Sequence, residues 1–479
     1  MKKLLCLCLS LIMVLSMVAC GGSGDAGENG STTAPKAEGL QIGYARESIM
    51  PEGQVNISGS GNQEHRVSTG YLDILYATCL AISENGNTIL LYSTDTLTAK
   101  SGWTATARQL ISTATGVPQN NIHIGATHTH SGPAVGGNEP LVQKWAEVYM
   151  NALIKSAEDA IADQAPATLY GKKVQTEQMN FVRHYKMDDG SYAGSNFGDF
   201  SKTIVGHATE GDEEMTLIKI DREGDKKDIM LMNFQGHPCF ASGSNYNELS
   251  ADYIGTTRDA FEKATGMQFI YFLGATGNQN TSSRVGSENG THNNDRVEYG
   301  AKLAQYAIDA LPTMTTPIEG SGVKTTQKKL TYKSNKYGQD RLADAQKVAT
   351  LFSQTGDTSS ANAMAKSMGF QSVYECRGIV SCASRPETSQ MTIDACSFGG
   401  VGFVAASYEM FSNSGLYIKD NSPYEFTVIS TVTNGYNNYI PSLEAYMYGC
   451  YESYTAIYEA GTAEAAAEEF VNMLKSLQQ

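Results

Sequence analysis

Several features that mark other classes of protein are missing from this 479-residue chain. Cationic residues are outnumbered, with 35 Lys and Arg against 50 Asp and Glu and a formal charge of −15, so no basic surface for nucleic-acid phosphates is expected. Cys-x-x-Cys pairs and zinc-ribbon spacings are absent, which argues against a metal site built on cysteine. The chain also has no internal repeat and no second low-complexity linker, so one large folded domain is the simplest prediction.

The apolar stretch at the N-terminus is too short for a stable membrane-spanning helix. Residues 1–20 read MKKLLCLCLSLIMVLSMVAC, in which two lysines precede an apolar run that ends in small residues, the pattern of a secretory signal. The last residues, SMVAC, resemble the bacterial lipoprotein box, which implies cleavage before Cys20 and lipidation of that cysteine. The alternative is a plain secreted protein that is cut nearby. Residues 21–39 are Gly/Ser-rich and predict a flexible tether, so we expect an extracytoplasmic protein anchored to the membrane through Cys20.

Alternating strand and helix patterns predict the fold of residues 40–479. Short β-type runs alternate with Gly and Asn turns at the start of this region, and ENGN between two apolar runs is typical of a β-hairpin. Apolar runs predict buried strands, and apolar positions at helical spacing predict helices over 102–116, 141–164, 253–264, 299–311, 341–368 and 462–477. We therefore predict an α/β fold with a mixed β-sheet core flanked by helices, in a single large catalytic domain.

Two histidines separated by one residue lie in GATHTHSGP, residues 125–133, between a strand-like run and a Gly-Pro turn. Alternation along a strand would place His128 and His130 on one face, about 7 Å apart. Imidazoles at a strand end can present metal ligands to a cleft, but the pair alone is equally compatible with a hydrogen-bonded strand end. The polar segments 236–238 and 275–280 also follow apolar strands, and clefts in α/β folds form beyond the carboxyl ends of strands.

The ordered series GATHTHSGP, NFQGHP, LSADYIG, GATGN, YEMF and NGYNNYIPS resembles the neutral/alkaline, non-lysosomal ceramidase family, from about residue 40 to the C-terminus. The resemblance implies the catalytic domain of a zinc-dependent amide hydrolase. Carried over position by position, it implies that zinc is held by His128, His237, Glu409 and Tyr439, with Tyr436 as the alternative tyrosine. It also implies that His130 is the second histidine of the family's pair, and that Arg183 in NFVRHY is an arginine near the substrate carbonyl.

These assignments give each residue a chemical role. Two imidazoles and a carboxylate leave zinc one or two open positions, as in catalytic sites, where the ion activates a water molecule and polarises a carbonyl. His130 would then reach the tetrahedral oxyanion or the leaving amine. Arg183 cannot deprotonate, so it suits stabilisation of an anion. Asp252 is the candidate for a partner that orients a ligand histidine.

Three departures from the family pattern bear on the substrate. The ceramidases of the family carry a Gly-Asp-x-Ser-Pro-Asn segment, but residues 277–282 read GNQNTS here, so Asn280 stands at the serine position. An amide cannot be the nucleophile, and water activated by zinc is therefore the expected nucleophile. Ser407-Tyr408 replaces Pro-Gly before Glu409, and the β-sandwich domain that follows the catalytic domain in ceramidases is expected to be absent.

We predict a surface-anchored zinc amidase that acts on ceramide or a related N-acyl amide. Two alternatives stay open at this point. One is a zinc hydrolase of another ester or amide, and the other is a ligand-binding lipoprotein without catalysis. The cysteine pairing and the oligomeric state cannot be ranked from these patterns.

Overall fold

The computed structural model describes residues 39–59, 66–241, 243–285 and 291–479. The expected signal peptide, its lipidation site Cys20 and nearly all of the tether lie outside these ranges, so the membrane anchor stays a prediction. The residues in these ranges cluster as one unit. Within the described ranges, no helix combines the length and the apolar character that crossing a membrane requires.

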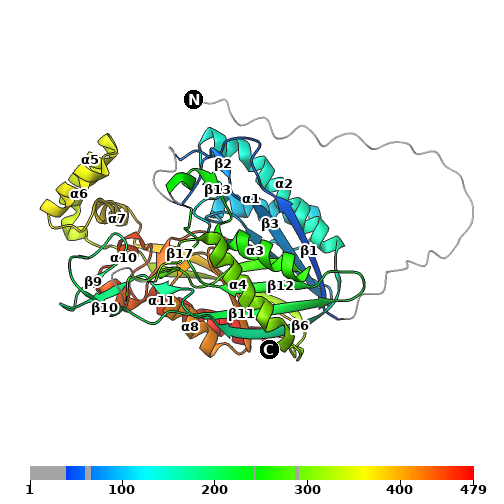
Figure 1. Cartoon of the computed structure of the whole chain (residues 1–479). Helices are drawn as coiled ribbons and strands as arrows, with labels where there is room; N and C mark the ends of the chain where they lie inside the picture. Colours follow the sequence, from blue (N-terminus) through cyan, green and yellow to red (C-terminus); the bar gives the residue numbers. More distant parts are fainter. Residues whose placement is uncertain (1–38, 60–65, 242, 286–290) are drawn as a thin grey trace, which may run out of the picture. The chain divides into compact units, whose positions relative to one another are not determined.

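An eight-stranded mixed sheet carries much of the core (Figure 1), with the strand order β14-β12-β11-β6-β1-β3-β4-β5. Its strands are β1 (Gln41–Ser48), β3 (Tyr76–Glu84), β4 (Asn87–Thr94), β5 (Ile122–Ala126), β6 (Ala165–Gln175), β11 (Glu214–Arg222), β12 (Ile229–Phe234) and β14 (Gln268–Leu273). The pairs β4–β5 and β12–β14 are parallel, and the other neighbours are antiparallel. The hairpin predicted at ENGN joins β3 to β4 through Asn85 and Gly86, which both have the positive φ that a two-residue hairpin loop favours.

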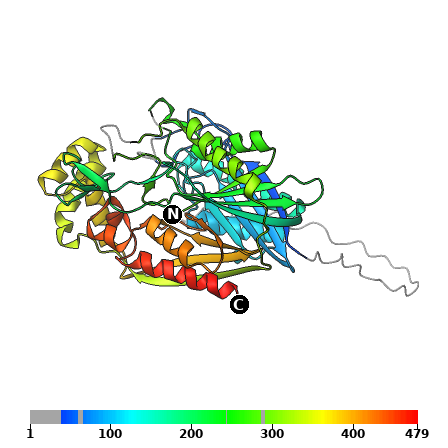
Figure 2. The ribbon, with the colours of Figure 1, turned by 60° about the horizontal axis from the view of Figure 1, so that its bottom comes forward.

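Four helices cover one face of this sheet (Figures 1 and 2). They are α1 (Ser101–Thr115), α2 (Pro140–Ala162), α3 (Asp252–Thr265) and α4 (Arg296–Ala310). Trp145 and Leu153 of α2 pack against the half of the sheet that contains β3, and Phe261 and Leu303 of α3 and α4 pack against the half that contains β12. Each helix begins and ends within about three residues of the predicted bounds, because its apolar stripe marks the face that is buried.

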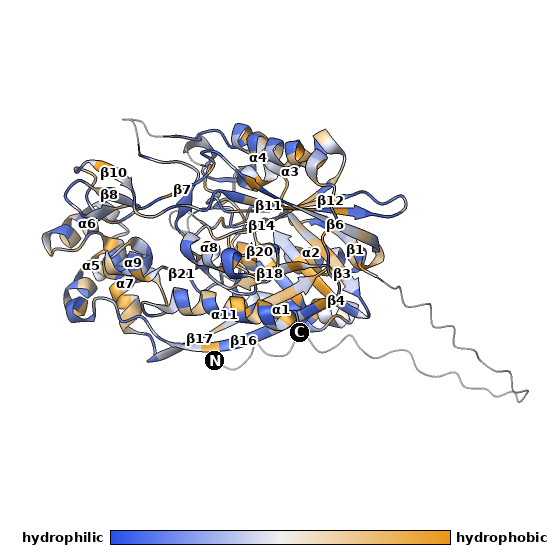
Figure 3. Ribbon diagram, turned by 90° about the horizontal axis from the view of Figure 1, so that it is seen from below, coloured by the Kyte–Doolittle hydropathy of each residue, from blue (hydrophilic) through white to orange (hydrophobic). Residues whose placement is uncertain are grey.

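A second sheet packs on the opposite face of the large one. Its strand order is β16-β17-β18-β20, with bounds Val323–Lys333, Thr388–Phe398, Val401–Ala406 and Phe426–Ser430. Phe403 and Val428 of this sheet share a core with Ile218 and Phe272 of the large sheet. The helices α8 (Ser412–Asn421) and α11 (Thr462–Leu477) cover its outer face (Figure 3). The layers are helices, sheet, sheet and helices, which confirms the predicted α/β class and adds a second sheet.

Shorter elements occupy the connections. The helices α5 (Leu342–Thr355), α6 (Thr358–Ser367) and α7 (Val373–Ala383) share a small core of their own, at the left of Figure 1. The predicted helix over 341–368 is two helices, because Gly356 with φ 66° ends α5 and the side chain of Asp357 caps α6. The remaining elements are short: β2 (Gly70–Tyr71), β7 (Phe181–Val182), β8 (Tyr185–Met187), β9 (Tyr192–Ala193), β10 (Ile204–His207), β13 (Glu248–Leu249), β15 (Gln279–Asn280), β19 (Glu409–Met410), β21 (Tyr439–Ile440), α9 (Leu443–Met447) and α10 (Tyr451–Thr455).

Candidate metal centre

Five segments that follow strands of the two sheets meet at one edge of the fold. The strands β5, β12, β14, β18 and β20 lead to residues 127–132, 236–241, 275–280, 407–411 and 431–439 respectively. Backbone hydrogen bonds join the segments: the amide of His130 donates to the carbonyl of Pro238 at 3.0 Å, and the amide of Glu409 donates to that of Asn438 at 2.9 Å. Polar residues from distant parts of the chain are thereby brought together at strand ends.

Three histidines, His128, His130 and His237, face one another in this region. Their potential ligand atoms all lie within 4.8 Å of one another, and Nε2 of His130 is 3.1 Å from Nε2 of His237. Burial lowers the pKa of His130 and of His237 well below the usual range, and the positive charge of Arg183 lowers both further. Both imidazoles are therefore neutral at pH 7, which is the form that binds a metal ion.

His128 reaches this cluster through a backbone turn. The strand β5 ends at Ala126, and His128 has a φ of 65°, a left-handed conformation that is uncommon outside glycine. Its Nδ1 lies 2.7 Å from the carbonyl oxygen of Leu97, which leaves Nε2 for the cluster. The prediction that strand alternation places His128 and His130 on one face is therefore wrong, because both residues lie beyond the strand. The turn brings their ring centroids to 5.2 Å.

Glu409, on β19, adds a carboxylate to the histidines. Its Oε2 lies 3.3 Å from Nε2 of His128 and 3.9 Å from Nε2 of His237, and its Oε1 accepts a hydrogen bond of 2.7 Å from the hydroxyl of Tyr436. Burial pushes the pKa of Glu409 upward, but His128, Tyr436 and Arg183 outweigh burial and hold that pKa below its usual value. The carboxylate is therefore ionised at neutral pH.

The donor set fits a zinc ion. Nε2 of His128 and Oε2 of Glu409 are buried and face each other at 3.3 Å, and neither has the geometry of a hydrogen bond with any described residue. Leaving such atoms unpartnered in the interior costs free energy, which a bound cation would remove. Ligand atoms around a tetrahedral zinc ion lie about 3.3 Å apart when the bonds are about 2.0–2.1 Å. Within the set of His128, His237 and Glu409, the separations of 3.3 Å between His128 and Glu409 and 3.9 Å between His237 and Glu409 lie at or somewhat above that value.

Two tyrosines lie beside Glu409. Tyr439, on β21, pairs with Glu409 in the register of β19, and Tyr436 bonds to the carboxylate. Burial and the charge of Glu409 raise the pKa of both phenols well above 10, so both are neutral in the absence of a metal. The guanidinium of Arg183 lies over the ring of Tyr439, with Cζ 5.5 Å from the ring centroid. The assignment of Tyr439 as a zinc ligand, with Tyr436 as the alternative, stays a prediction.

Arg183 belongs to a second buried cluster. Its Nε and Nη2 donate to Oε1 of Glu452 at 3.0 and 2.5 Å, and Nε2 of His184 lies 3.0 Å from Oε2. His184, Cys450 and Glu452 also bring potential ligand atoms within 4.8 Å of one another. Both carboxylate oxygens are already bonded, however, and the guanidinium would repel a cation, so we assign this cluster as an ion-pair network.

Sequence reasoning missed Glu452 and His184. The signal that could have found them is the Arg-His pair of NFVRHY itself. A buried guanidinium needs a carboxylate partner, and the imidazole of His184 stands next to it in the chain. The sequence alone does not indicate which of the 50 acidic residues supplies that partner.

Asp252 holds the segment behind His237. Its Oδ2 accepts the amide hydrogen of Phe240 and its Oδ1 that of Tyr253, each at 2.8 Å. Nδ1 of His237 lies instead 3.3 Å from the carbonyl oxygen of Thr276, which takes the orienting position predicted for Asp252. Burial raises the pKa of Asp252 to about 6.

Asn280 lies on β15, next to the backbone that supports His237. It pairs with Phe181 of β7, while the carbonyl of its neighbour Gln279 accepts the amide hydrogen of His237 at 3.1 Å. Oδ1 of Asn280 is buried and has no hydrogen-bond partner within the described part of the chain. Asn280, which stands at the family's serine position, is thus the neighbour of the residue whose carbonyl binds the amide of His237.

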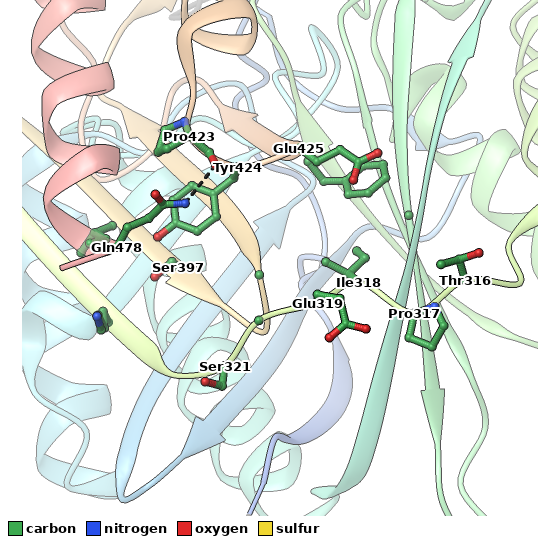
Figure 4. A pocket seen from close by; sticks show the side chains of 16 residues that line it. Thr316, Pro317, Ile318, Glu319, Ser321, Ser397, Pro423, Tyr424, Glu425 and Gln478 are labelled. Carbon is green, nitrogen blue, oxygen red and sulfur yellow. Dashed lines mark hydrogen bonds between the residues drawn. The ribbon is translucent and has the colours of Figure 1, made fainter.

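A hollow of about 590 Å³ lies between residues 316–321 and 423–426 (Figure 4). Its wall includes Glu319, Tyr424, Glu425 and Gln478, whose side-chain amide donates to the carbonyl of Pro423 at 2.9 Å. The described residues that line it include no histidine and no cysteine. It is separate from the histidine cluster, and we assign it no catalytic role.

Solved structures share this fold. The neutral ceramidase from Pseudomonas aeruginosa matches with a TM-score of 0.68 and 15% sequence identity, over 92% of this chain and 75% of that chain. A ceramidase complexed with C2 matches with a TM-score of 0.67 and 16% identity, over 92% and 76%. No protein-family model and no curated protein sequence matches the chain. The chain therefore has the fold of the neutral ceramidases, and the resemblance drawn from its motifs is confirmed at the level of the fold.

Proposed function

We propose that this chain is a zinc-dependent hydrolase that cleaves the amide bond of ceramide or of a related N-acyl amide. The observation that carries the proposal is the buried group of His128, His237 and Glu409, in which a nitrogen and an oxygen lack hydrogen-bond partners. The two structures that share the fold are both described as ceramidases, which supports ceramide as the first substrate to test.

The residues divide the chemistry among them. His128, His237 and Glu409 would hold the ion, with Tyr439 or Tyr436 as a further ligand. A zinc ion bound there would polarise the substrate carbonyl and activate water. Burial lowers the pKa of His130, so the imidazole is neutral and one ring nitrogen carries a free lone pair. We propose His130 as the group that moves a proton to the leaving amine.

Arg183 supplies a fixed positive charge. Glu452 and Tyr439 outweigh the effect of burial and raise the pKa of the guanidinium above its already high value, so it stays protonated. It is therefore suited to donate hydrogen bonds to the oxyanion that forms when the carbonyl carbon becomes tetrahedral.

Hydrolysis of a panel of N-acyl amides and esters, ceramide included, tests the proposal. The purified chain is assayed alone, with a chelator, and after zinc is restored. Chelator-sensitive release of fatty acid from ceramide would support both the metal and the substrate, and rates should rise with acyl length because each buried CH₂ contributes about 0.8 kcal/mol. Cleavage of other amides or esters alone would keep the zinc hydrolase and discard ceramide. A zinc-loaded chain that cleaves nothing would favour a ligand-binding protein.

A further inference from the structure

Glu452, on α10, binds two consecutive residues with one carboxylate. Oε1 accepts hydrogen bonds from Nε and Nη2 of Arg183, and Oε2 lies 3.0 Å from Nε2 of His184. All three side chains are more than nine-tenths buried. Burying an ion pair costs desolvation free energy that the mutual attraction barely offsets. The position of this pair therefore calls for an explanation other than stability.

The pair is oriented toward the metal centre. Its bonds to Glu452 use the Nε–Nη2 edge of the guanidinium and leave Nη1 for other partners. The guanidinium also lies over the ring of Tyr439, with its Cζ 5.5 Å from the ring centroid. The backbone is held as well, since the amide of Arg183 donates to the carbonyl of Asn278 at 2.8 Å. Arg183 thus lies between Glu452 and the residues proposed to hold the ion.

The charge of Arg183 lies next to a proposed ligand, because its guanidinium lies over the ring of Tyr439 and Tyr439 pairs with Glu409 on the neighbouring strand. A zinc ion at the centre would meet the same positive charge, and repulsion between two cations is strong in an interior of low dielectric. A guanidinium this close to a zinc ion therefore needs an anion that offsets it.

We propose that Glu452 is a positioning residue of the metal centre, which holds the guanidinium of Arg183 toward the centre and neutralises its charge so that zinc binds beside it. The inference rests on the proposed function in taking the metal to be zinc. Neighbouring groups fix the carboxylate: Nδ1 of His184 lies 2.8 Å from the hydroxyl of Tyr448, whose ring stacks on Tyr192 with centroids 4.2 Å apart.

The test compares zinc affinity and turnover in two variants of the full chain. Glu452→Gln leaves Arg183 without its anion, so we expect the zinc dissociation constant, measured by competition with a chelator of known affinity, to rise about tenfold. The double variant Arg183→Met/Glu452→Gln carries neither charge. It should bind zinc within about twofold of the unaltered chain, while turnover stays low because the guanidinium is gone. Glu375→Gln is the matched control, since Glu375 is equally buried but lies on α7, and it should leave zinc affinity unchanged.

Two results would overturn the proposal. Zinc binding in the double variant that is as weak as in Glu452→Gln would mean that packing, not charge, was disturbed. Unchanged affinity in Glu452→Gln would mean that Arg183 does not act on the ion.

If Glu452→Gln does not unfold cooperatively, Glu452→Asp replaces it. This shorter side chain keeps the charge but cannot keep both bonds, so zinc affinity should hold within about twofold while turnover falls about tenfold. A weakened affinity would contradict neutralisation, and unchanged turnover would contradict positioning. An unaltered chain that binds zinc but hydrolyses nothing would remove the proposed function and leave the affinity comparison intact, whereas a chain that binds no zinc would overturn both.

Discussion

The two buried polar clusters differ in whether their nitrogen and oxygen atoms have hydrogen-bond partners. In the cluster of His128, His130, His237 and Glu409, a nitrogen and an oxygen lie 3.3 Å apart and neither has a hydrogen-bond partner in the described structure. In the cluster around Glu452, both carboxylate oxygens are bonded to cationic or imidazole groups. Each cluster brings three potential ligands within 4.8 Å, so spacing does not separate them. Hydrogen bonding does, because the first cluster leaves a nitrogen and an oxygen without hydrogen bonds, whereas the second already contains a cation that is bonded to its carboxylate.

Removing one potential ligand from each cluster tests this comparison most severely. We expect His128→Ala to lose bound zinc and all hydrolysis, because the ligands that remain are too few to hold the ion, and His237→Ala to do the same. Cys450→Ala is the matched variant of the other cluster, since Cys450 is also fully buried. It should keep full zinc content, measured by elemental analysis after dialysis, with thermal unfolding as the check on folding. Loss of zinc in Cys450→Ala would show that the second cluster also holds a metal.

His130→Ala sharpens the comparison inside the first cluster. Nε2 of His130 is close enough to Nε2 of His237 for both to bind one ion. If His130 transfers protons, its removal should lower kcat by about 10²–10⁴-fold while zinc is retained. Zinc content and turnover are measured on the same preparation. A variant that loses its zinc would instead identify His130 as a ligand.

The two clusters also differ in how far the sequence predicts them. Each residue of the first follows an apolar strand in a short polar motif, and such residues meet because strand carboxyl ends share one edge. The order of the motifs along the chain supplied the remaining candidate ligands. Glu452 has no comparable signal, since it lies in the five-residue helix α10 and its partner Arg183 is 269 residues away. A pairing over that distance is fixed by the packing of the whole fold, which no local pattern records.

The helices and strands of the fold also differ in how far the sequence predicts them. Long amphipathic helices such as α2 and α11 were predictable because each buries one continuous stripe. α8, with the sequence SNSGLYIKDN, has few apolar positions, and it escaped prediction together with α7. Apolar runs mark strands of the second sheet, such as β18. Their packing on the opposite face of the large sheet could not be predicted, because the contacts join residues far apart in the chain.

Acidification should weaken the second cluster through Glu452. Burial opposes the charge of this carboxylate, but His184 and Arg183 hold its pKa at about 2, below its usual 4.5. A folded pKa lower than the unfolded one means that the ionised group contributes stability above pH 4.5, and that this contribution is lost as the pH falls toward 2. The difference in unfolding free energy between the unaltered chain and Glu452→Gln should therefore shrink by about 2 kcal/mol between pH 6 and pH 3. Denaturant titrations at both pH values measure it, and a constant difference would contradict the assigned ion pair.

The smallest effect is expected at Asn280. If water is the nucleophile, Asn280 forms no bond to the substrate carbon, and Asn280→Ala loses at most one hydrogen bond of about 1 kcal/mol, or roughly five- to tenfold in kcat. Ser283→Ala is the variant for comparison. Oγ of Ser283 lies 2.9 Å from Nε2 of His207, and such a contact with a histidine can activate a serine hydroxyl as a nucleophile.

That hydroxyl also accepts the amide hydrogen of Val285 at 3.0 Å, and Ser283 is only 3% exposed, so we expect turnover within about threefold of the unaltered chain. Abolished hydrolysis in Ser283→Ala, with zinc still bound, would place the nucleophile on the Ser283–His207 pair. Abolished hydrolysis in Asn280→Ala would make the amide part of the catalytic apparatus. Either result would contradict the comparison, because the reacting atoms would then lie outside the cluster that is proposed to hold the metal.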